Sequence, residues 1–588
     1  MVIAELHKIQ HDHGYIPEKS LYELSAKLNI PVYELHGVAS FYPGFRMQPP
    51  PKVEVLVCGD FPCHLRGCGK LRGQLEELAS GHDDVKVGHV SCLGQCDRAP
   101  AFVINDHVFA GKSTEEAVAL VKSAMDGKKV EGMHFHGLKG PFLCDPYATP
   151  NDHYGMVKEL AKSGDAAGVI KKLKDGGLRG MGGAGFPTGV KWEAVKNCPG
   201  DTKYVVCNAD ECEVGTFKDR EIMKNVPHLL VEGMVLAGLV TGATQGYIYI
   251  RHEYHDQIHV MDAEIERARK LGIVGENAAG SGKKYELQTF TSPGGYIQGE
   301  ESALLEAIEG KRGQPRVKPP FPVFVGLWGK PTVINNVETL AYTPAILSKG
   351  ADGWKGLGKQ TTTVIDYEKD EKGNPNIKKW TLKPGGAVGG VKWIGVSGHV
   401  NTPGVFEVPM GTTYEEAIYK LGGGILGGKK LKAFAPSGPS GGFLPASMIG
   451  LSMDFNIMGN VKFRGGFGAM LGSGAIVAIA EGTDMVELAL NACRFFRNES
   501  CGKCVPCRVG SQKMVDTIFA ILDGRGTKED IEHIDELSDT LLMTSICGLG
   551  QVVPAPILSV LEFFRDEIDA RIDKTQLARP ERSAVGAK

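Results

Sequence analysis

The chain has 588 residues, and its 66 basic and 69 acidic side chains leave a net charge of −3. Such a length exceeds what one hydrophobic core supports, and the balanced charge excludes an electrostatic footprint for nucleic acid or for an anionic membrane. No signal peptide and no apolar run of about 18 residues is evident, so we expect several domains, a cytoplasmic location and no membrane span.

The first 50 residues show the periodicity of short amphipathic helices. Ile3, Leu6 and Ile9 fall on one helical face, and Leu21 and Leu24 belong to a second apolar stripe. Three prolines at positions 49–51 end this pattern. The sequence therefore predicts a small helical bundle over residues 1–50.

Two cysteine pairs follow in residues 51–126, each at the end of a predicted strand. A strand at 53–57 leads to Cys58 and Cys63, and a strand at 85–90 leads to Cys92 and Cys96. Four thiolates from C-x4-C and C-x3-C groups suit a [2Fe–2S] cluster or a zinc ion. Zinc sites prefer tighter C-x2-C pairs, so we favour iron, and a redox dithiol is disfavoured because this part of the chain has no C-x2-C motif.

A glycine-rich stretch at residues 178–192 is the next feature, after a linker expected at 127–150. Its glycines include Gly180, Gly182, Gly183 and Gly185. Glycines let backbone amides point into one concavity, which suits a phosphate or the edge of a planar ring. The letters also match G-x-G-x-x-G, but that dinucleotide motif should follow a strand, and residues 170–175 end a helix instead. The alternative is a flexible surface loop, against which the neighbouring Phe186 and Pro187 argue.

Polar loops gather in the domain that we expect at residues 151–394. One follows a strand at 204–207 and carries three carboxylates, another opens a helix with two carboxylates, a third at 316–322 is rigid and basic, and a fourth has two asparagines at 335–336. Open α/β sheets bind ligands at the carboxyl ends of their strands. Each loop alone could be a solvated turn or a helix start, but together they favour a flavin site.

The last third is predicted to be helical, over residues 465–575, with a polar tail at 576–588. A charged passage at 365–390 indicates a loop insertion, and residues 395–464 indicate a small hairpin-and-helix domain without evident chemistry. Cys501, Cys504 and Cys507 stand at C-x2-C-x2-C spacing, and Cys547 can supply a fourth thiolate, a pattern typical of a [4Fe–4S] cluster.

The remaining cysteines occur singly, and we expect each to be a small, neutral, buried residue. These six are Cys68, Cys144, Cys198, Cys207, Cys212 and Cys493.

The glycine-rich stretch, the polar loops and the cubane cysteines resemble those of the NADH-oxidising flavoprotein subunit of respiratory complex I and its soluble diaphorase relatives. Residues 1–125 resemble the neighbouring thioredoxin-like [2Fe–2S] subunit, here fused in front. The resemblance implies a multidomain α/β and α fold: a helical bundle, a thioredoxin-like domain at 51–126, a Rossmann-like flavin domain, a small β-grasp-like domain at 395–464 and a C-terminal helical bundle with a cluster.

The resemblance further implies an NADH dehydrogenase with FMN, NAD(H), [2Fe–2S] and [4Fe–4S] as cofactors, and hydride transfer at the flavin without a catalytic side chain. The nicotinamide nucleotide would lie near Phe186, Glu213, Glu301, Lys318 and Phe321. The other cofactor-binding residues that it implies are Gly180, Gly182, Gly183, Ala184, Gly185, Lys191, Asn208, Asp210, Glu211, Tyr296, Gly299, Glu300, Asn335, Asn336 and Thr339. The implied cluster ligands are Cys58, Cys63, Cys92 and Cys96 for [2Fe–2S], and Cys501, Cys504, Cys507 and Cys547 for [4Fe–4S].

The chain departs from the family where Met181, Cys212, Val214 and Gln298 stand, which affects the finer shape of the nicotinamide pocket. Because no second substrate site is evident, we expect a hetero-oligomer with a separate catalytic subunit. The fusion, the uncharged Met181 and residues 441–447 are closer to the beta subunit of metal-dependent, NAD-linked formate dehydrogenases. We therefore expect a molybdenum or tungsten formate dehydrogenase partner, with a soluble NAD-reducing hydrogenase as the alternative. A function of another class would be an iron–sulfur electron relay without NADH activity.

Overall fold

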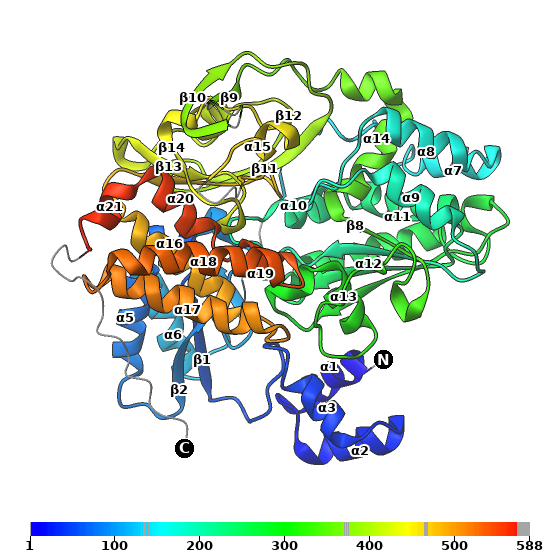
Figure 1. Ribbon diagram of the computed structural model, residues 1–588. Coiled ribbons are helices and arrows are strands. Elements are labelled where there is room, and N and C mark those ends of the chain that lie inside the picture. Colours follow the sequence, from blue (N-terminus) through cyan, green and yellow to red (C-terminus); the bar gives the residue numbers. More distant parts are fainter. Residues whose placement is uncertain are drawn as a thin grey trace, which may run out of the picture.

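A computed structural model describes residues 2–130, 132, 137, 138, 140–369, 371, 373, 375–463 and 468–572. The expected tail at 576–588 and part of the expected linker at 127–150 lie outside these residues. Figure 1 shows three sheets flanked by helices, with the N-terminal helices at the foot of the molecule and the C-terminal helices beside the first sheet. The architecture is multidomain and contains both α/β and helical parts.

Three helices form the N-terminal bundle: α1 (Val2–His13), α2 (Glu18–Leu28) and α3 (Val32–Ala39). Their apolar faces share one core with side chains from residues 206 to 334. The Tyr42 hydroxyl donates to the carbonyl of Lys311 at 2.6 Å, and Arg312 Nε donates to the carbonyl of Gly37 at 2.8 Å. The bundle is therefore docked on the flavin domain and not on the sheet that follows it in the sequence.

The first sheet has the order β2-β1-β3-β4. Its strands are β1 (Val53–Cys58), β2 (Val85–Val90), β3 (Ala101–Ile104) and β4 (His107–Ala110), and its helices are α4 (Phe61–Leu65), α5 (Cys68–Ala79) and α6 (Thr114–Met125). β1 pairs with β2 in parallel and with β3 antiparallel. Apolar residues alternate along β1, so that Val53, Val55 and Val57 are buried. The expected cluster cysteines follow β1 and β2 at one edge of this sheet.

The second sheet is fully parallel, with the order β7-β6-β5-β8. Its strands are β5 (Tyr204–Ala209), β6 (Gln245–Arg251), β7 (Glu286–Ser292) and β8 (Thr332–Asn336). The surrounding helices are α7 (Gly155–Ser163), α8 (Ala166–Asp175), α9 (Thr188–Asn197), α10 (Lys218–Asn225), α11 (Pro227–Thr241), α12 (His255–Lys270), α13 (Glu301–Ile308) and α14 (Val337–Lys355). The chain moves outward from β5 to β7 and then returns to the other side of β5, so the topological switch point lies between β5 and β8.

The third sheet has the order β12-β11-β15-β13-β14. Its strands are β11 (Val391–Gly398), β12 (Gly404–Pro409), β13 (Leu431–Ala435), β14 (Leu444–Pro445) and β15 (Ala475–Ala480), and the short helix α15 (Phe455–Gly459) lies beside it. The sheet thus takes in residues on both sides of the 395–464 range expected for the small domain. β11 and β15 are buried along their whole length.

The charged passage at 365–390 was predicted to be a loop, and this prediction is wrong. It forms an antiparallel hairpin of β9 (Val364–Lys369) and β10 (Pro375–Lys383). Trp380 pairs with Tyr367, and Leu382 pairs with Ile365. Apolar residues at every second position give the hairpin one packed face, while the charges that suggested a loop lie between them.

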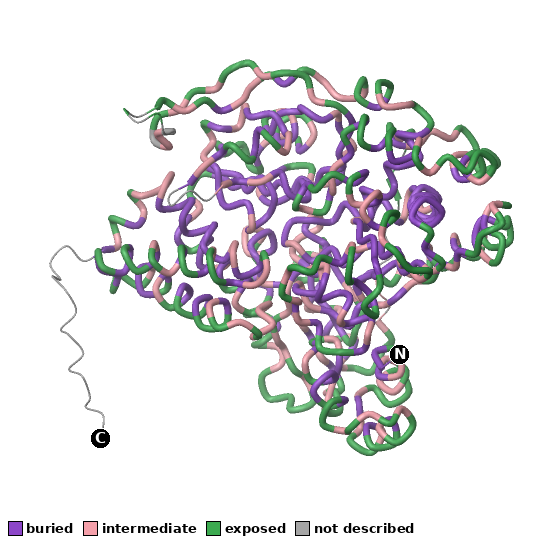
Figure 2. The backbone as a smooth tube through the Cα atoms, turned by 45° about the vertical axis from the view of Figure 1, so that its right-hand side comes forward, coloured by how far each residue is buried: buried purple, intermediate pink, exposed green. Residues whose placement is uncertain are grey.

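Six helices complete the chain: α16 (Met485–Asn498), α17 (Val505–Leu522), α18 (Lys528–Thr544), α19 (Gly548–Val552), α20 (Ala555–Phe563) and α21 (Arg565–Asp569). One hydrophobic core joins these helices to the second and third sheets. Figure 2 shows the buried backbone concentrated at the centre, with exposed segments at the periphery. Within the described ranges, no helix combines the length and the apolar character that a membrane crossing requires.

Candidate functional site

The glycine-rich stretch forms a closed loop between α8 and α9. Gly180 N donates to Phe186 O and Thr188 N donates to Leu178 O, both at 2.9 Å. The loop follows a helix and not a strand, as the sequence predicts, so it is not a Rossmann dinucleotide turn. The backbone hydrogen bonds hold the loop in one shape, which argues against the alternative of a flexible surface loop.

Two glycines of this loop are required by space or by backbone conformation. A Cβ on Gly182 would lie 2.9 Å from the Cβ of Asn336, and Gly185 has φ +66° and would meet the ring of Phe455 at 2.9 Å. Met181 N donates to the hydroxyl of Thr339 at 2.8 Å, which ties the loop to the start of α14. The loop backbone therefore lies directly over the carboxyl end of β8.

The carboxyl ends of β5 and β8 carry the predicted asparagines side by side. Asn208 on β5 is in register with Asn336 on β8. Asn208 Nδ2 donates to Gly299 O at 2.8 Å, and the indole of Trp192 donates to Asn335 Oδ1 at 2.9 Å. The structure thus brings together three of the predicted loops, from 208, 299 and 335, at the topological switch point, where open α/β sheets bind ligands.

Asp210 and Glu211, which follow β5, differ in how their carboxylates are satisfied. Glu211 accepts from the backbone amides of Asp219 at 2.8 Å and Arg220 at 3.1 Å and from the Tyr254 hydroxyl at 3.0 Å. Asp210 is 5% exposed, and its Oδ1 has no hydrogen-bond partner among the described residues. Burial raises the pKa of Asp210 to about 7. A buried carboxyl with an unpaired oxygen fits a ligand that donates a hydroxyl, as the ribityl chain of FMN does.

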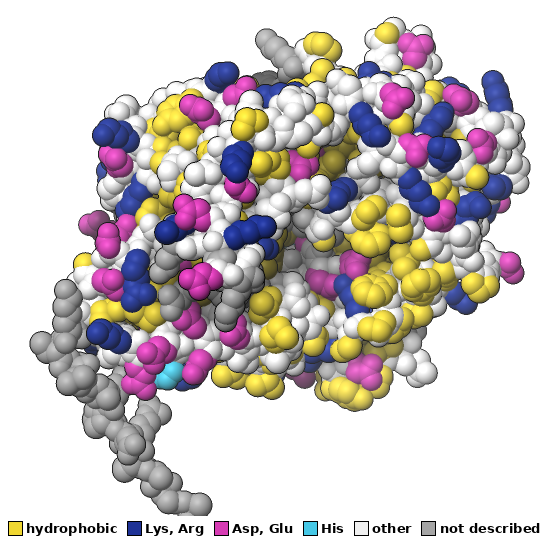
Figure 3. All heavy atoms as spheres, turned by 45° about the horizontal axis from the view of Figure 1, so that its top comes forward, with side chains coloured by type: hydrophobic (Ala, Val, Ile, Leu, Met, Phe, Trp, Pro, Cys, Tyr) yellow, Lys and Arg dark blue, Asp and Glu magenta, His cyan; other side chains and the backbone are white. Residues whose placement is uncertain are grey.

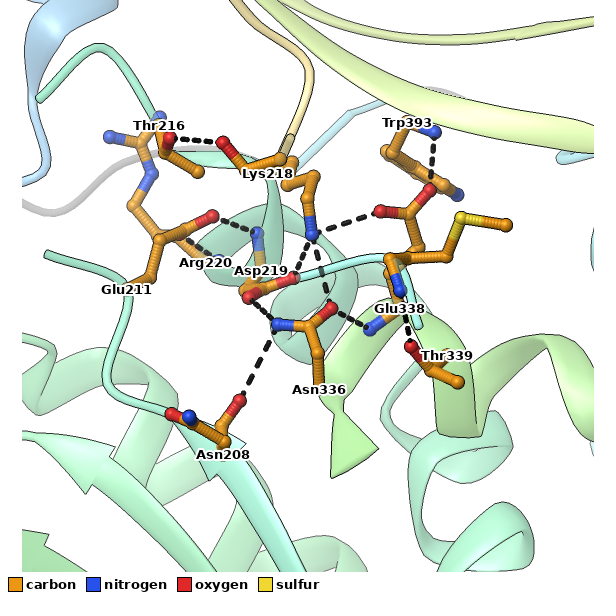
Figure 4. Close-up of polar contacts among 12 residues, drawn as sticks. Asn208, Glu211, Thr216, Lys218, Asp219, Arg220, Asn336, Glu338, Thr339 and Trp393 are labelled. Carbon is orange, nitrogen blue, oxygen red and sulfur yellow. Dashed lines mark hydrogen bonds and ion pairs between the residues drawn. The ribbon is translucent and has the colours of Figure 1, made fainter. Parts of the chain in front are cut away.

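A buried ionic network lies behind Asn336 (Figure 4). Lys218 Nζ lies 2.6 Å from Asp219 and 2.9 Å from Glu338, and it donates to Asn336 Oδ1 at 3.2 Å. Lys392 of β11 reaches Glu338 at 3.2 Å and Met181 O at 3.4 Å. Burial lowers the pKa of Lys392 to about 8, although the charge of Glu338 opposes this shift. The network joins the third sheet to the glycine-rich loop.

A second polar group lies on the side of the loops that faces the C-terminal helices. The Tyr296 hydroxyl and Ser440 both donate to the carboxylate of Glu213. The backbone amide of Tyr296 donates to Glu499 at 2.8 Å, and the Tyr296 ring lies edge-on to Phe495 with centroids 5.0 Å apart. Tyr296 therefore connects the flavin loops with α16, the helix that leads to the C-terminal cysteines.

Lys318 lies between the two carboxylates at the start of α13. Its Nζ contacts Glu300 at 2.7 Å and Glu301 at 2.8 Å, and Glu300 also caps the helix by accepting from Ser302 N and Ala303 N. Lys191 Nζ donates to Ile334 O at 2.9 Å and lies 4.0 Å from Glu301. One acidic and basic cluster thus spans α9, α13 and the basic loop.

Two aromatic rings border this cluster at the surface. Phe186 is 52% exposed and Phe321 is 49% exposed. Figure 3 shows a hollow on one face of the molecule, with charged side chains inside it and hydrophobic side chains along its rim. Exposed aromatic rings beside a polar cluster suit the stacking of a planar heterocycle.

The N-terminal cluster cysteines are buried and lie as two pairs. The thiols of Cys92 and Cys96 are 3.3 Å apart. A hydrogen bond with Cys63, together with burial, raises the pKa of the Cys58 thiol well above its usual range. Over the described part of the chain, no three His, Cys, Asp or Glu side chains converge on a point that could hold one metal ion. Two pairs of thiols suit a two-iron cluster, in which each iron takes one pair.

The C-terminal cysteines lie closer to the surface. Cys507 is buried, whereas Cys501, Cys504 and Cys547 are half-buried. Electrostatic interactions connect Cys547 with Cys501, and Cys507 with both Cys501 and Cys504, so the four thiols share one neighbourhood. Gln314 Nε2 donates to Cys501 O at 3.3 Å, which joins this group to the flavin domain.

Five of the six single cysteines are buried, and Cys198 is half-buried. Burial raises the pKa of Cys212, the one nearest the flavin loops, well above its usual range, as expected for an inert thiol. Sequence reasoning missed several polar residues of the site, namely Lys218, Glu338, Lys392, Ser440 and Glu499. A weak signal existed for Lys392, because it is a charged residue inside the apolar strand β11.

Comparison with known proteins assigns families to four parts of the chain. Residues 1–125 match a thioredoxin-like [2Fe–2S] ferredoxin, residues 173–345 the Nuo51 FMN-binding domain, residues 394–444 an SLBB domain, and residues 487–571 the NADH-ubiquinone oxidoreductase-F iron–sulfur binding region. These matches confirm the predicted fold class and the predicted FMN and iron–sulfur cofactors.

Individual relatives agree with these assignments. The F-type flavoprotein component of the NADH-quinone oxidoreductase of Aquifex aeolicus is 41% identical over 72% of this chain and 90% of its own. NADP-reducing hydrogenase subunit HndC of Solidesulfovibrio fructosivorans is 38% identical over 74% of this chain and 82% of its own. A crystal structure of an NAD+-reducing [NiFe]-hydrogenase in the H2-reduced state superposes with a TM-score of 0.82 and 30% identity, covering 97% of this chain and 93% of that one.

Proposed function

The chain belongs to the family of the F-type components of NADH-quinone oxidoreductases, and from this membership we propose how its residues divide the work of an NADH dehydrogenase-type subunit. Electrons pass between NAD(H), FMN and the iron–sulfur clusters, and from the [4Fe–4S] cluster to or from a separate catalytic subunit. FMN, when bound, accepts two electrons as hydride and releases them singly. The protein supplies orientation, charge and exclusion of water.

FMN is held at the switch point between β5 and β8. The observation that carries this assignment is the convergence of the glycine-rich loop with Asn208, Asn335 and Asn336, beside the unpaired oxygen of Asp210. The nicotinamide nucleotide lies on the exposed side, where Phe186 and Phe321 offer rings for stacking. Glu213, Glu301 and Lys318 supply the polar groups of that side.

Cys58, Cys63, Cys92 and Cys96 hold the [2Fe–2S] cluster, and Cys501, Cys504, Cys507 and Cys547 hold the [4Fe–4S] cluster. The two sets differ in exposure, since every thiol of the first set is buried and three thiols of the second are half-buried. Exposed apolar side chains stand beside the second set at Val505, Val509 and Met543, which is 79% exposed. Electrons therefore enter or leave through the [4Fe–4S] side of the molecule, where an apolar surface can meet a partner.

The first candidate for that partner is a hydrogen-activating nickel–iron subunit, supported by the similarity to the NAD+-reducing [NiFe]-hydrogenase over almost the whole of both chains. The second candidate is a molybdenum or tungsten formate dehydrogenase, supported by the uncharged Met181 and by the sequence at 441–447. Metal analysis of the native complex distinguishes the two: nickel supports the first, and molybdenum or tungsten supports the second.

The NADH activity itself has a direct test. Anaerobic addition of NADH to the purified yellow protein should bleach its flavin absorbance. A preparation with full iron and flavin content that NADH does not bleach would contradict the proposed nucleotide site and favour an electron relay.

A further inference from the structure

Two buried arginines of the flavin domain reach across to the loop that carries Cys92 and Cys96. Arg251, the last residue of β6, is 1% exposed, and its Nη2 donates to the carbonyl of Cys92 at 2.6 Å. Arg220 on α10 is 2% exposed, and its Nη1 donates to the carbonyl of Gly94 at 2.6 Å. The cluster loop of one domain is thus held by charged groups of another.

The other end of Arg251 lies in the flavin site. Its Nη1 donates to the carbonyl of Glu211, a residue that follows β5. One guanidinium therefore contacts a cluster-bearing loop and a flavin-bearing loop at the same time. Because its planar fork fixes both contacts, Arg251 sets the spacing of the two loops as well as carrying charge.

The charge of Arg251 is partly balanced. Glu253 accepts from Arg251 Nε at 3.0 Å and from Nη2 at 2.8 Å. Burial opposes the ionisation of Glu253, but the charge of Arg251 lowers the pKa of this carboxyl to about 2. Glu253 is thus ionised at every working pH, and the net field at the cluster depends on both members of the pair.

Arg251 is the nearer of the two to the cysteines. It contacts the backbone of Cys92 itself, and a hydrogen bond with Cys96 together with the positive charge of Arg251 lowers the pKa of the Cys92 thiol to about 7, against the effect of burial. Arg220 is in turn balanced by Asp97 at 2.9 Å and Glu221 at 2.8 Å. A positive charge next to a cluster ligand favours the reduced cluster, which carries one more negative charge.

We propose that Arg251 is a positioning residue of the [2Fe–2S] centre, which raises the reduction potential of that cluster from the flavin domain, with Glu253 as its counterweight. The inference rests on the proposed ligand role of Cys92. It concerns the reduction potential, and the titration that tests it uses dithionite and mediators. Failure of the NADH site would therefore leave the test intact.

The test is a redox titration, followed by electron paramagnetic resonance, of the full chain carrying both clusters. Arg251→Met should lower the midpoint potential of [2Fe–2S] by at least a tenfold change in the reduction equilibrium, about 59 mV for one electron. Glu253→Gln should raise that potential, because it leaves the arginine charge unbalanced. The potential of the [4Fe–4S] cluster in the same sample is the internal control.

Arg267→Met is the matched control variant, since Arg267 is paired with Glu264 at 2.6 Å on α12 and contacts no cluster cysteine among the described residues. It should leave both potentials unchanged. If Arg251→Met loses the [2Fe–2S] signal, Glu253→Gln decides the question. A Glu253→Gln protein with a full signal and an unshifted potential would overturn the proposal.

Discussion

The hydroxyl of Tyr296 donates a 2.5 Å hydrogen bond to Oε2 of Glu213, and the other oxygen of Glu213 accepts from Ser440 N at 3.1 Å and Ser440 Oγ at 2.7 Å. Three separate segments thus fix one carboxylate: the loop after β5, the turn that opens at 296, and the third sheet's domain at 440. Burial raises the pKa of Glu213, and the three donors oppose that shift. A carboxylate held so firmly is pre-organised for a ligand.

Replacing Glu213 with Gln should weaken NADH binding more than FMN binding. Loss of a charged hydrogen-bond acceptor costs about 1.5–3 kcal/mol, which corresponds to about a 10- to 100-fold rise in KM for NADH. Steady-state kinetics and the flavin content of the purified protein measure the two effects. Glu276→Gln, at an exposed carboxylate, is the control. Equal loss of NADH affinity and flavin would assign Glu213 to the flavin loops instead.

The pH dependence of NADH binding should report the same residue. Because the pKa of Glu213 is raised, its negative charge is lost at a higher pH than for an ordinary carboxyl group. KM for NADH should therefore rise as the pH falls towards the acid range, and this limb should be missing in Glu213→Gln. An identical acid limb in the variant would show that another group titrates.

Gly182→Ala should reduce flavin retention. The new Cβ would lie 2.9 Å from the Cβ of Asn336, so the glycine-rich loop and the end of β8 must move apart. We expect a lower ratio of flavin to protein after purification, measured by absorbance, with both clusters still present. Gly73→Ala on the exposed face of α5, where a Cβ meets nothing within 4 Å, is the control. Full flavin content in Gly182→Ala would place FMN away from this loop.

Cys547→Ser should remove the [4Fe–4S] signal and keep the [2Fe–2S] signal. NADH should still bleach the flavin, but reduction of the partner subunit should fail, because the exposed cluster is its contact. Paramagnetic resonance and partner-dependent turnover measure these effects. Cys493→Ala removes a buried thiol that donates to Val553 O at 3.4 Å, and it should leave both clusters intact. Retention of four-iron signals in Cys547→Ser would require a different fourth ligand.

Lys392→Met should change how stability depends on pH. The folded-state pKa of Lys392 is about 8, below the usual 10.5. Between these values the unfolded chain binds one more proton than the native chain, so this group makes stability rise with pH through that window, by at most about 3 kcal/mol. Thermal unfolding at pH 7.5 and pH 10 should show this relative gain in the wild type and not in the variant. Lys429→Met, at an exposed site, is the control, and parallel profiles of the wild type and Lys392→Met would contradict the prediction.

Contacts that only the fold creates account for what sequence reasoning missed. Lys392 meets Glu338 from 54 positions away, and Arg251 meets Cys92 from 159 positions away. Hydrophobic periodicity reports that a segment is buried, but it does not say which buried charges face each other. The hairpin at 364–383 was missed for a related reason, since its charged residues concealed the alternation of Ile365, Tyr367, Trp380 and Leu382.

The sequence by itself determined the cofactor classes, because cluster ligation depends on cysteine spacing and a flavin loop depends on glycines that are local in the chain. It also predicted which loops belong together, since strand ends of a parallel sheet meet at one edge. Only the tertiary structure decided that the [2Fe–2S] cysteines are enclosed and the [4Fe–4S] cysteines are not, and that Arg251 joins the cluster loop to the flavin loop. Exposure and ion pairing are properties of packed surfaces, and residues distant in sequence acquire them only when their domains dock.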